Sequence, residues 1–315
     1  MRIVFFGTSE FGVPLLKLLI AGPHELAAVV TQPNRPRGRG RRLEPGPIWS
    51  AAEAAGLRLL APPDPNNTRF VAELSQLRPD LGVLTAYGRI LGPALLKLPA
   101  RGFINLHPSL LPAYRGAAPI QRALMAGCTT TGVTVIRMTE EVDAGDILNQ
   151  EPVTVGPDET AGELSLRLAN VGARLVTKTI GELLEGTAQA RPQTQCCATH
   201  APKVTDSERY LQWKRPASEL HNLVRALSPK PCACTFFRSR RVLVLRSGLA
   251  QGTTTAQPGT ILLDRPGLEV ATGFGILSLL EVRPEAGKTQ AGASFRNGLR
   301  PVPGERFESR DVECK

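Results

Sequence analysis

Long hydrophobic runs are absent from this sequence of 315 residues. Arg, Lys, Glu, Gly or Pro interrupts every apolar stretch before it reaches the roughly 20 residues that a membrane-spanning helix needs. The run from Met1 to Gly7 is strand-like from its start, and it resembles neither a cleavable apolar leader nor an Arg- and Ser-rich amphipathic one. We therefore expect a cytoplasmic protein that has no membrane partner.

Cysteine is scarce as well. The six cysteines are irregularly spaced, at Cys128, Cys196, Cys197, Cys232, Cys234 and Cys314. This pattern does not indicate a disulfide framework, so reduced thiols are expected. The adjacent pair and the Cys-x-Cys pair also lack the usual spacing of zinc ligands, and no metal site is predicted.

Acidic residues are outnumbered, because 38 Lys and Arg stand against 28 Asp and Glu, which gives a net charge of +10. Residues 206–315 hold 17 basic and 11 acidic residues, a net of +6. The short stretch from Arg35 to Arg42 holds five Arg and no acidic residue. A basic Gly- and Pro-rich loop is often only solvated, but the excess of positive charge favours a polyanionic partner.

The first half of the chain alternates between two hydrophobic periods. Flat apolar runs predict strands at 2–6, 26–31, 81–87, 102–106 and 132–138, and helical patterns lie between them at 11–20, 47–55, 68–77, 90–97 and 117–126. This alternation predicts a doubly wound α/β domain with a parallel sheet covered on both faces. Residues 146–155 form a further strand or hairpin in this prediction, and a long amphipathic helix at 160–184 closes the domain.

A polar segment separates this half from a second pattern. We predict a catalytic domain over 1–185, a linker over 186–205 and a second domain over 206–315. In the last, a helix at 217–227 precedes short β runs at 233–237, 241–245, 259–263, 267–272 and 276–282. Such runs favour a small OB-like β-barrel, which also suits a nucleic-acid binder. His221, on the predicted helix, is expected at the surface.

The turn from Gly7 to Gly12 follows a predicted strand and opens a helix. It has only two glycines, and Ser9 occupies the position of the second glycine in the dinucleotide-binding fingerprint. A tight strand-to-helix turn is therefore favoured over a phosphate site.

Two polar residues end the predicted strand at 102–106. Asn105 and His107 are two residues apart and so share one face, directly before a Pro-bounded loop. Ligands bind where strands of an open α/β sheet end, His suits proton transfer near pH 7, and Asn offers a donor to an oxyanion. Asp143 or Asp146 could orient the imidazole, although turn chemistry alone would also explain both. Because no Ser or Cys is suitably placed, direct group transfer to an amine is favoured over a covalent intermediate.

These residues resemble the folate-dependent formyltransferases, and the resemblance extends through most of the chain. The run from Asn105 to Pro112, continued by Tyr114-Arg115-Gly116-Ala117-Ala118-Pro119-Ile120, is similar to their signature, and Val142-Asp143-Ala144-Gly145-Asp146 is similar to their catalytic aspartate loop. Within that superfamily, the segments 31–43 and 225–231 resemble methionyl-tRNA formyltransferases. Two positions depart from the pattern: Pro108 stands where Gly is frequent, and His200 stands where Tyr is usual.

The resemblance implies a Rossmann-like catalytic domain followed by an OB-like domain, and a catalytic trio of Asn105, His107 and Asp143. It implies that 10-formyltetrahydrofolate is the co-substrate, with a site lined by Ser109, Leu110, Leu111 and Pro112. We expect Asn105 to donate to the formyl oxygen and His107 to carry the proton, with Asp143 either fixing its tautomer and favouring the charged imidazole or holding a relaying water.

The implied acceptor is methionyl-initiator tRNA, which becomes N-formylmethionyl-tRNA for translation initiation. Arg39 is expected to reach the end of the acceptor stem, and the tRNA-contacting arginines would be Arg35, Arg37, Arg39, Arg41 and Arg42. We expect a monomer.

Two rival functions remain open. The same trio could formylate a small amine or hydrolyse the folate, but neither needs the basic loop or the basic second domain. A non-catalytic RNA-binding protein is the other rival, and the intact trio disfavours it.

Overall fold

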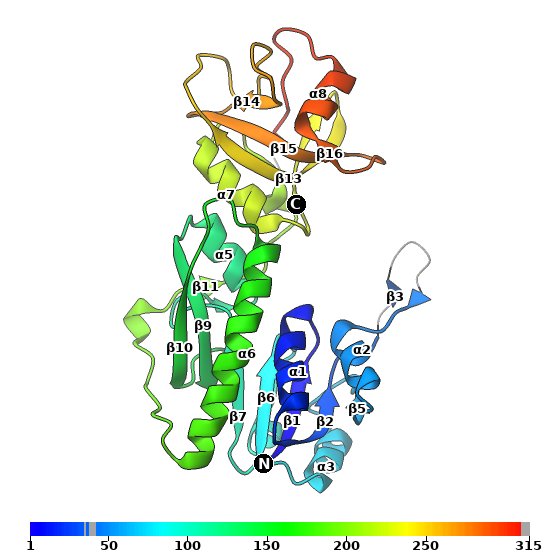
Figure 1. The fold of residues 1–315 in the computed structure, drawn as a ribbon, viewed down its shortest axis with the longest axis vertical. Coiled ribbons are helices and arrows are strands. Elements are labelled where there is room, and N and C mark those ends of the chain that lie inside the picture. Colours follow the sequence, from blue (N-terminus) through cyan, green and yellow to red (C-terminus); the bar gives the residue numbers. More distant parts are fainter. Residues whose placement is uncertain (35, 38–41, 310–315) are drawn as a thin grey trace. The chain divides into compact units, whose positions relative to one another are not determined.

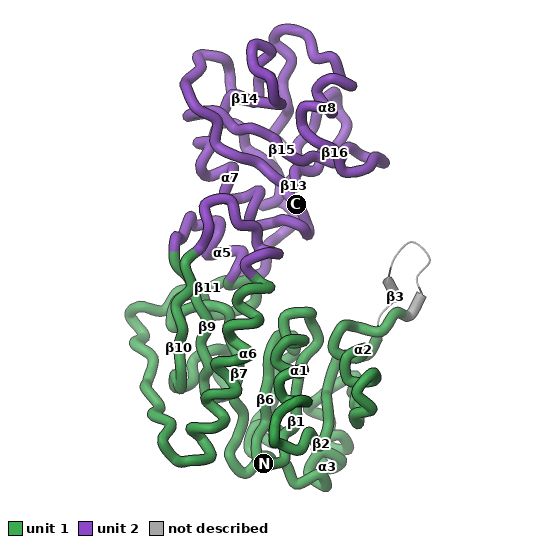
Figure 2. Tube along the Cα trace, viewed as in Figure 1, with its two compact units in different colours: residues 1–119, 130–154, 165–201 green, residues 120–129, 155–164, 202–315 purple. Residues whose placement is uncertain are grey.

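The computed structural model describes residues 1–34, 36–37 and 42–309. The chain divides into two compact units, coloured separately in Figure 2. The first unit comprises residues 1–119, 130–154 and 165–201, and the second comprises 120–129, 155–164 and 202–315.

A seven-stranded sheet forms the centre of the first unit (Figure 1). Its strands, in spatial order, are β10 (Ile147–Thr154), β9 (Thr130–Arg137), β7 (Phe103–His107), β6 (Leu81–Thr85), β1 (Arg2–Gly7), β2 (Glu25–Val30) and β5 (Leu59–Leu60). The five strands from β7 to β5 run parallel. β6 and β7 are buried along their whole lengths, which matches the flat apolar pattern of the sequence.

Helices cover the faces of this sheet. They are α1 (Val13–Ala21), α2 (Pro47–Ala54), α3 (Thr68–Gln76), α4 (Pro93–Leu96) and α6 (Ala161–Glu185), with the short 3₁₀ turns η1 (Glu10–Gly12) and η2 (Gln195–Cys197). A β-carbon on Gly172 of α6 would lie 2.7 Å from the side chain of Leu106, so this helix lies directly against β7. The expected helix at 90–97 is shorter because α4 begins at Pro93, a residue suited to the first turn of a helix.

One edge of the sheet differs from the all-parallel prediction. β9 pairs antiparallel with β7, and β10 pairs antiparallel with β9. Only residues 138–146 connect β9 to β10, which is too short for the crossover that parallel neighbours need. The α/β class predicted from the sequence is nevertheless confirmed, with a Rossmann-like parallel majority.

Two small strand pairs accompany this sheet. β8 (Arg115–Gly116) pairs with β11 (His200–Ala201), and β3 (Pro36–Arg37) pairs antiparallel with β4 (Arg42–Leu43). The first pair joins the linker to the segment that follows β7. The second lies in the basic segment.

The second unit is built on a curled antiparallel sheet. Its strands are β12 (Ala233–Phe237), β13 (Arg240–Ala250), β15 (Ile276–Pro284) and β14 (Glu269–Ala271), with β16 (Gln290–Ala291) paired to β15. Its helices are α7 (Ala217–Leu227) and α8 (Gly292–Leu299), with the 3₁₀ turn η3 (Ser207–Arg209) and nearly all of α5 (Pro119–Met125). The expected strand at 259–263 forms only isolated bridges, from Thr260 to Arg306 and from Ile261 to Val270.

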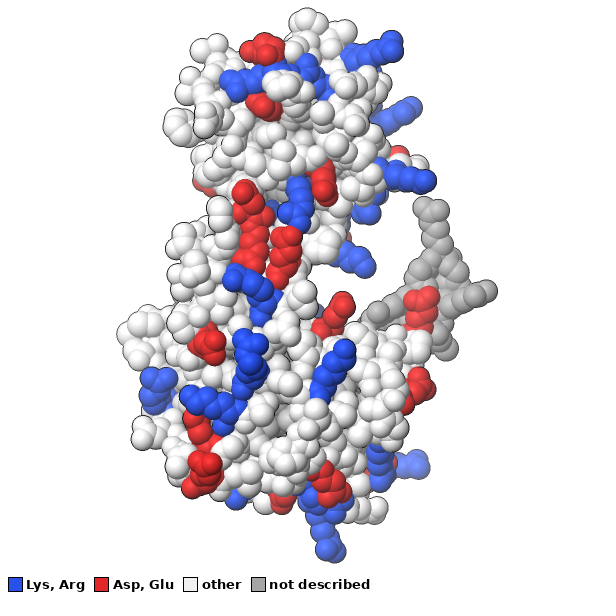
Figure 3. All heavy atoms as spheres, viewed as in Figure 1, with Lys and Arg blue, Asp and Glu red and all other residues white. Residues whose placement is uncertain are grey.

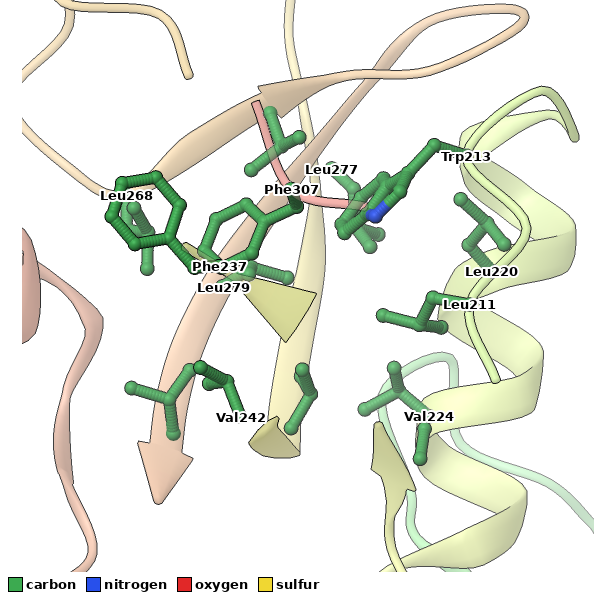
Figure 4. Packing of buried hydrophobic residues seen from close by; sticks show 14 of the residues in the cluster. Leu211, Trp213, Leu220, Val224, Phe237, Val242, Leu268, Leu277, Leu279 and Phe307 are labelled. Carbon is green, nitrogen blue, oxygen red and sulfur yellow. The ribbon is translucent and has the colours of Figure 1, made fainter. Parts of the chain in front are cut away.

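Aromatic side chains fill the core of the second unit (Figure 4). Trp213 and Phe307 lie with their ring centroids 5.8 Å apart, and Phe237 lies 5.4 Å from Phe307. The indole nitrogen of Trp213 donates to Thr235 Oγ1 at 3.0 Å, so this buried donor is satisfied. Val224 and Leu220 bring α7 into the same cluster.

His221 corrects a prediction, because it is buried rather than exposed. Its Nδ1 lies 3.0 Å from Ser247 Oγ, and its Nε2 lies 3.1 Å from the carbonyl oxygen of Pro157. α7 therefore contacts both β13 and residues 155–164, and no pattern in the sequence predicted the second contact. Arg225, one turn later, likewise donates to the carbonyl oxygen of Gly156 at 3.2 Å.

Candidate active site

Three neighbouring parallel strands end at one edge of the first unit's sheet. Gly7 of β1 lies opposite Thr85 of β6, and Leu84 of β6 lies opposite Asn105 of β7. Since the chain order reverses between β1 and β6, this edge is the switch point at which open α/β sheets bind ligands.

The loop after β1 is the tight turn that the sequence favoured. The backbone N–H of Gly12 donates to the carbonyl of Ser9 at 3.1 Å and is therefore not free for a phosphate. A β-carbon on Gly12 would lie 3.0 Å from Thr85, so close packing accounts for this glycine.

Asn105 and His107 share one face of β7, as their spacing predicts. Their exposed fractions are 8% and 4%, which makes both side chains polar groups in an apolar strand. Such groups need partners, and the partners come from a turn that is distant in sequence.

The turn between β9 and β10 supplies the third member of the predicted trio. Asn105 Nδ2 donates to Asp143 Oδ1 at 3.2 Å, and His107 Nδ1 lies 3.4 Å from Asp143 Oδ2. The backbone N–H of Gly116 donates to the same Oδ2 at 2.9 Å. The structure thus brings Asn105, His107 and Asp143 together, whereas Asp146 pairs through its carbonyl with the backbone of Arg137.

The tautomer of His107 follows from its second contact. Nε2 lies 2.9 Å from the carbonyl oxygen of Tyr114, which can only accept, so Nε2 carries a hydrogen. In the neutral imidazole Nδ1 is then unprotonated, and it faces Asp143. The carbonyl of Tyr114 therefore performs a task that the sequence led us to expect of Asp143.

Asn105 has one atom without a partner. Within the described part of the chain, its buried Oδ1 accepts no hydrogen bond. Its Nδ2 carries two hydrogens, and the contact with Asp143 uses one of them. A buried amide with spare donor and acceptor capacity fits a ligand that presents both an oxygen and an N–H.

The segment from Ser109 to Pro112 lies beside the trio, but most of its polar groups already form hydrogen bonds with other residues of the protein. The Ser109 hydroxyl donates to the carbonyl of Ala113 at 2.6 Å, and Thr134 Oγ1 donates to the carbonyl of Ser109 at 2.6 Å. Gln150 Nε2 donates to the carbonyl of Leu111 at 2.7 Å. These bonds indicate that the loop holds a fixed shape next to β7.

The predicted tRNA-contacting arginines fall mostly beyond the structural description. Arg35, Arg39 and Arg41 lie outside the described residues, while the backbones of Arg37 and Arg42 pair in β3 and β4. On the face in view, Figure 3 shows basic and acidic side chains interleaved over the first unit. It also shows several Lys and Arg side chains along one edge of the second unit.

Sequence reasoning missed the loop that follows β6. Ala86 and Gly88 have positive φ angles, and the carbonyl of Tyr87 accepts from Thr8 Oγ1 at 3.0 Å and Gln32 Nε2 at 2.7 Å. Ile90 in this loop is 69% exposed. The loop flanks the switch point, so the rule that ligands bind at strand ends would have identified it.

Sequence reasoning also missed Gln193. Its Nε2 donates to the carbonyls of Asp143 and Gly145, each at 2.8 Å. No motif marks it, because it lies 50 residues from Asp143 in a polar linker.

The described residues contain no cluster of three or more His, Cys, Asp or Glu suited to a metal ion. None of the helices among them is long and apolar enough to cross a membrane.

Comparison with known families defines the class of this protein. Residues 1–180 match the formyl transferase model, and residues 203–300 match the model of the formyl transferase C-terminal domain. The two-unit fold with its Asn-His-Asp cluster is thus that of a formyltransferase.

Curated relatives narrow the class further. The methionyl-tRNA formyltransferase of Moorella thermoacetica is 43% identical over 306 residues, which cover 97% of this chain and 98% of that protein. The one from Heliobacterium modesticaldum is 41% identical and covers 98% of this chain and 100% of that protein. The chain belongs to the methionyl-tRNA formyltransferase family.

Solved structures share the fold at low sequence identity. A sugar 3N-formyl transferase, crystallised in the presence of dTDP and 5-N-formyl-THF, aligns with a TM-score of 0.69 at 17% identity, covering 89% of this chain and 97% of that chain. HypX from Aquifex aeolicus, in complex with tetrahydrofolic acid, aligns with a TM-score of 0.66 at 17% identity, covering 94% of this chain and 47% of that chain.

Proposed function

We propose that this protein transfers the formyl group of 10-formyltetrahydrofolate to the free α-amino group of methionyl-initiator tRNA, which yields N-formylmethionyl-tRNA. The observation that carries the proposal is the cluster of the buried Asn105 and His107 with the half-buried Asp143, in which Asn105 Oδ1 lacks a partner among the described residues. The full-length similarity to curated methionyl-tRNA formyltransferases supports the choice of acceptor.

Asn105 has the geometry to stabilise the tetrahedral adduct. The neutral α-amine attacks the formyl carbon, and the formyl oxygen gains negative charge. The second hydrogen of Asn105 Nδ2 donates to that oxygen, while Oδ1 accepts from the attacking N–H. A buried donor of this kind acts in a medium of low dielectric, where it is worth more than in water.

His107 carries the proton, and Asp143 stabilises the imidazole while it is charged. The new N–C bond forms and the bond from the formyl carbon to the folate nitrogen breaks, so one proton must pass from the amine to that nitrogen. Nδ1 of His107 is the ring nitrogen that can take it, because Nε2 already donates to Tyr114. Asp143 Oδ2, at 3.4 Å from Nδ1, favours the charged imidazole directly or through a water. No covalent enzyme intermediate is required.

The substrates would be held by loops around this cluster. We assign the folate to the edge of the sheet beside Ser109, Leu110, Leu111 and Pro112, together with the loop after β6 that exposes Ile90. The tRNA would contact the basic segment from Arg35 to Arg42 and the basic second unit. The proposal includes a cytoplasmic location and a monomeric state, and light scattering of the purified protein tests the latter.

The decisive experiment incubates the pure protein with 10-formyltetrahydrofolate and either methionyl-initiator tRNA or free methionine. Formylation of the charged tRNA alone is the expected result. Folate turnover without formylmethionyl-tRNA would still identify the cluster as a catalytic site, but it would show that the formyl acceptor is a small amine or water.

A further inference from the structure

Arg115 presents a buried charge with an unusual partner. Only 5% of its side chain is exposed, and its nearest ion-pair partner in the described residues is Glu141 Oε1 at 3.9 Å, on a side chain that is 71% exposed. The guanidinium instead donates from Nε at 3.0 Å and from Nη2 at 2.7 Å to the side-chain oxygen of Gln193, and from Nη1 at 3.0 Å to that of Gln195. Burying a cation against neutral amides is costly, so the arrangement calls for a reason other than stability.

Gln193 links Arg115 to the turn between β9 and β10, which carries Asp143. Since its Oε1 is held by two guanidinium donors, its Nε2 must face acceptors, and it donates to the carbonyls of Asp143 and Gly145 at 2.8 Å each. The amide orientation is thereby fixed without ambiguity. The positive charge of Arg115 also polarises the amide and strengthens its N–H donors.

The turn needs such support. Asp143 has φ +52°, in the left-handed region that non-glycine residues seldom adopt. The two carbonyls held by Gln193 flank Ala144, so the clamp fixes the backbone directly after the strained residue. Gly116, next to Arg115 in β8, donates its N–H to the Asp143 carboxylate at 2.9 Å.

We infer that Arg115 and Gln193 form a positioning clamp that holds the Asp143 turn, and with it the carboxylate, against Asn105 and His107. The inference rests on the proposed role of Asp143 in formyl transfer. Neither residue of the clamp touches the reacting atoms. Its effect should therefore appear in kcat, since substrate contacts are left in place.

Two substitutions of Gln193 distinguish its proposed role in positioning the Asp143 turn from a role only as a hydrogen-bond acceptor for Arg115. Gln193→Glu still accepts from Arg115 but cannot donate to the two carbonyls at neutral pH, whereas Gln193→Met removes both contacts. Both variants should lose about 10- to 100-fold in kcat, with KM for each substrate within about threefold of wild type. Wild-type kcat in Gln193→Glu would show that Gln193 only accepts the hydrogen bonds of Arg115, and it would overturn the inference.

Gln257→Met is the matched control. Gln257 also accepts from an arginine, Arg306 Nη1 at 2.7 Å, but belongs to the second unit. Its kcat should equal that of the wild type.

A double-mutant cycle tests whether the clamp acts through Asp143. In an Asp143→Asn background, Gln193→Met should lower kcat by less than about twofold further, since the group it positions is already lost. An undiminished further loss would contradict the clamp.

Hydrogen exchange provides a readout independent of the reaction. The amides of Gly116 and of residues 139–146 should exchange at least about tenfold faster in both Gln193 variants. Unchanged exchange would overturn the clamp even if Asp143 is catalytic. Conversely, faster exchange in a protein that forms no formylmethionyl-tRNA would retain the clamp and reject the proposed function.

Discussion

At the residue scale, the two ring nitrogens of His107 have separate tasks. Nε2 holds its hydrogen on the carbonyl of Tyr114, so proton transfer falls to Nδ1 beside Asp143. We therefore expect His107→Ala and Asp143→Ala to lower kcat by more than about a hundredfold, with tRNA binding nearly unchanged. Single-turnover formylation and a filter-binding assay measure the two quantities.

His24→Ala is the control for this pair, because His24 lies in the same unit but in the loop between α1 and β2, outside the cluster of Asn105, His107 and Asp143. Turnover of the wild-type order in either variant would remove that residue from the mechanism. Loss of tRNA binding in parallel with kcat would instead point to a general disturbance of the fold.

At the element scale, the turn between β9 and β10 is fitted around a glycine. A β-carbon on Gly145 would lie 1.8 Å from the carbonyl oxygen of Arg137, so Gly145→Ala must shift the turn by more than an ångström. Because such a shift moves Asp143, kcat should fall by about a hundredfold or more. The control is Gly181→Ala on α6, where the added methyl meets nothing within 4 Å and should stabilise the helix by about 0.5–1 kcal/mol. Equal kcat in the two variants would contradict the expected shift.

The start of α6 makes folding stability depend on pH. Glu163 accepts from the backbone N–H of Thr160 at 2.9 Å and pairs with Arg246, and these contacts lower the pKa of Glu163 to about 2. Since the folded pKa lies below the ordinary 4.5, the carboxylate stabilises the protein above about pH 4.5, and this contribution is lost as the pH falls toward 2.

Urea unfolding at several pH values tests this contribution. The stability difference between wild type and Glu163→Gln should be constant above pH 5 and shrink toward zero near pH 2, since Gln keeps the capping bond but not the charge. Arg246→Gln should show only part of the effect, because the Thr160 bond remains. A difference that stays flat over this range would refute the assignment.

At this same scale, the local hydrophobic pattern of the sequence predicted most helices and strands, but it did not predict which distant residues they contact. The strand that carries Asn105 and His107 followed from its apolar run, whereas α8 was missed because Gly292 and Gly298 weaken its helical pattern. The Arg115–Gln193 contact spans 78 residues, and no spacing rule links two such positions. The burial of His221 depended on the packing of α7 against residues 155–164, which hydrophobic periodicity does not encode.

At the scale of the whole molecule, charge separates binding from catalysis. The trio holds one imidazole and one carboxylate, while the Arg35 to Arg42 segment carries +5 and residues 206–315 carry +6, so the rest of the chain has a net charge of −1. Each phosphate contact by Arg or Lys releases counterions, so the slope of log K against log salt counts such contacts.

Replacing Arg35, Arg37, Arg39, Arg41 and Arg42 with Gln should therefore reduce that slope by up to about four units if all five meet phosphates, at about 0.7–0.9 per contact. Titration of methionyl-initiator tRNA from about 50 to 200 mM salt measures it. Arg58→Gln is the control, because Arg58 is already paired with Glu73 at 3.0 Å. An unchanged slope in the variant with all five substitutions would leave the basic second unit as the source of the electrostatic affinity for tRNA. A slope reduced by about one unit would indicate that only one of the five arginines contacts a phosphate.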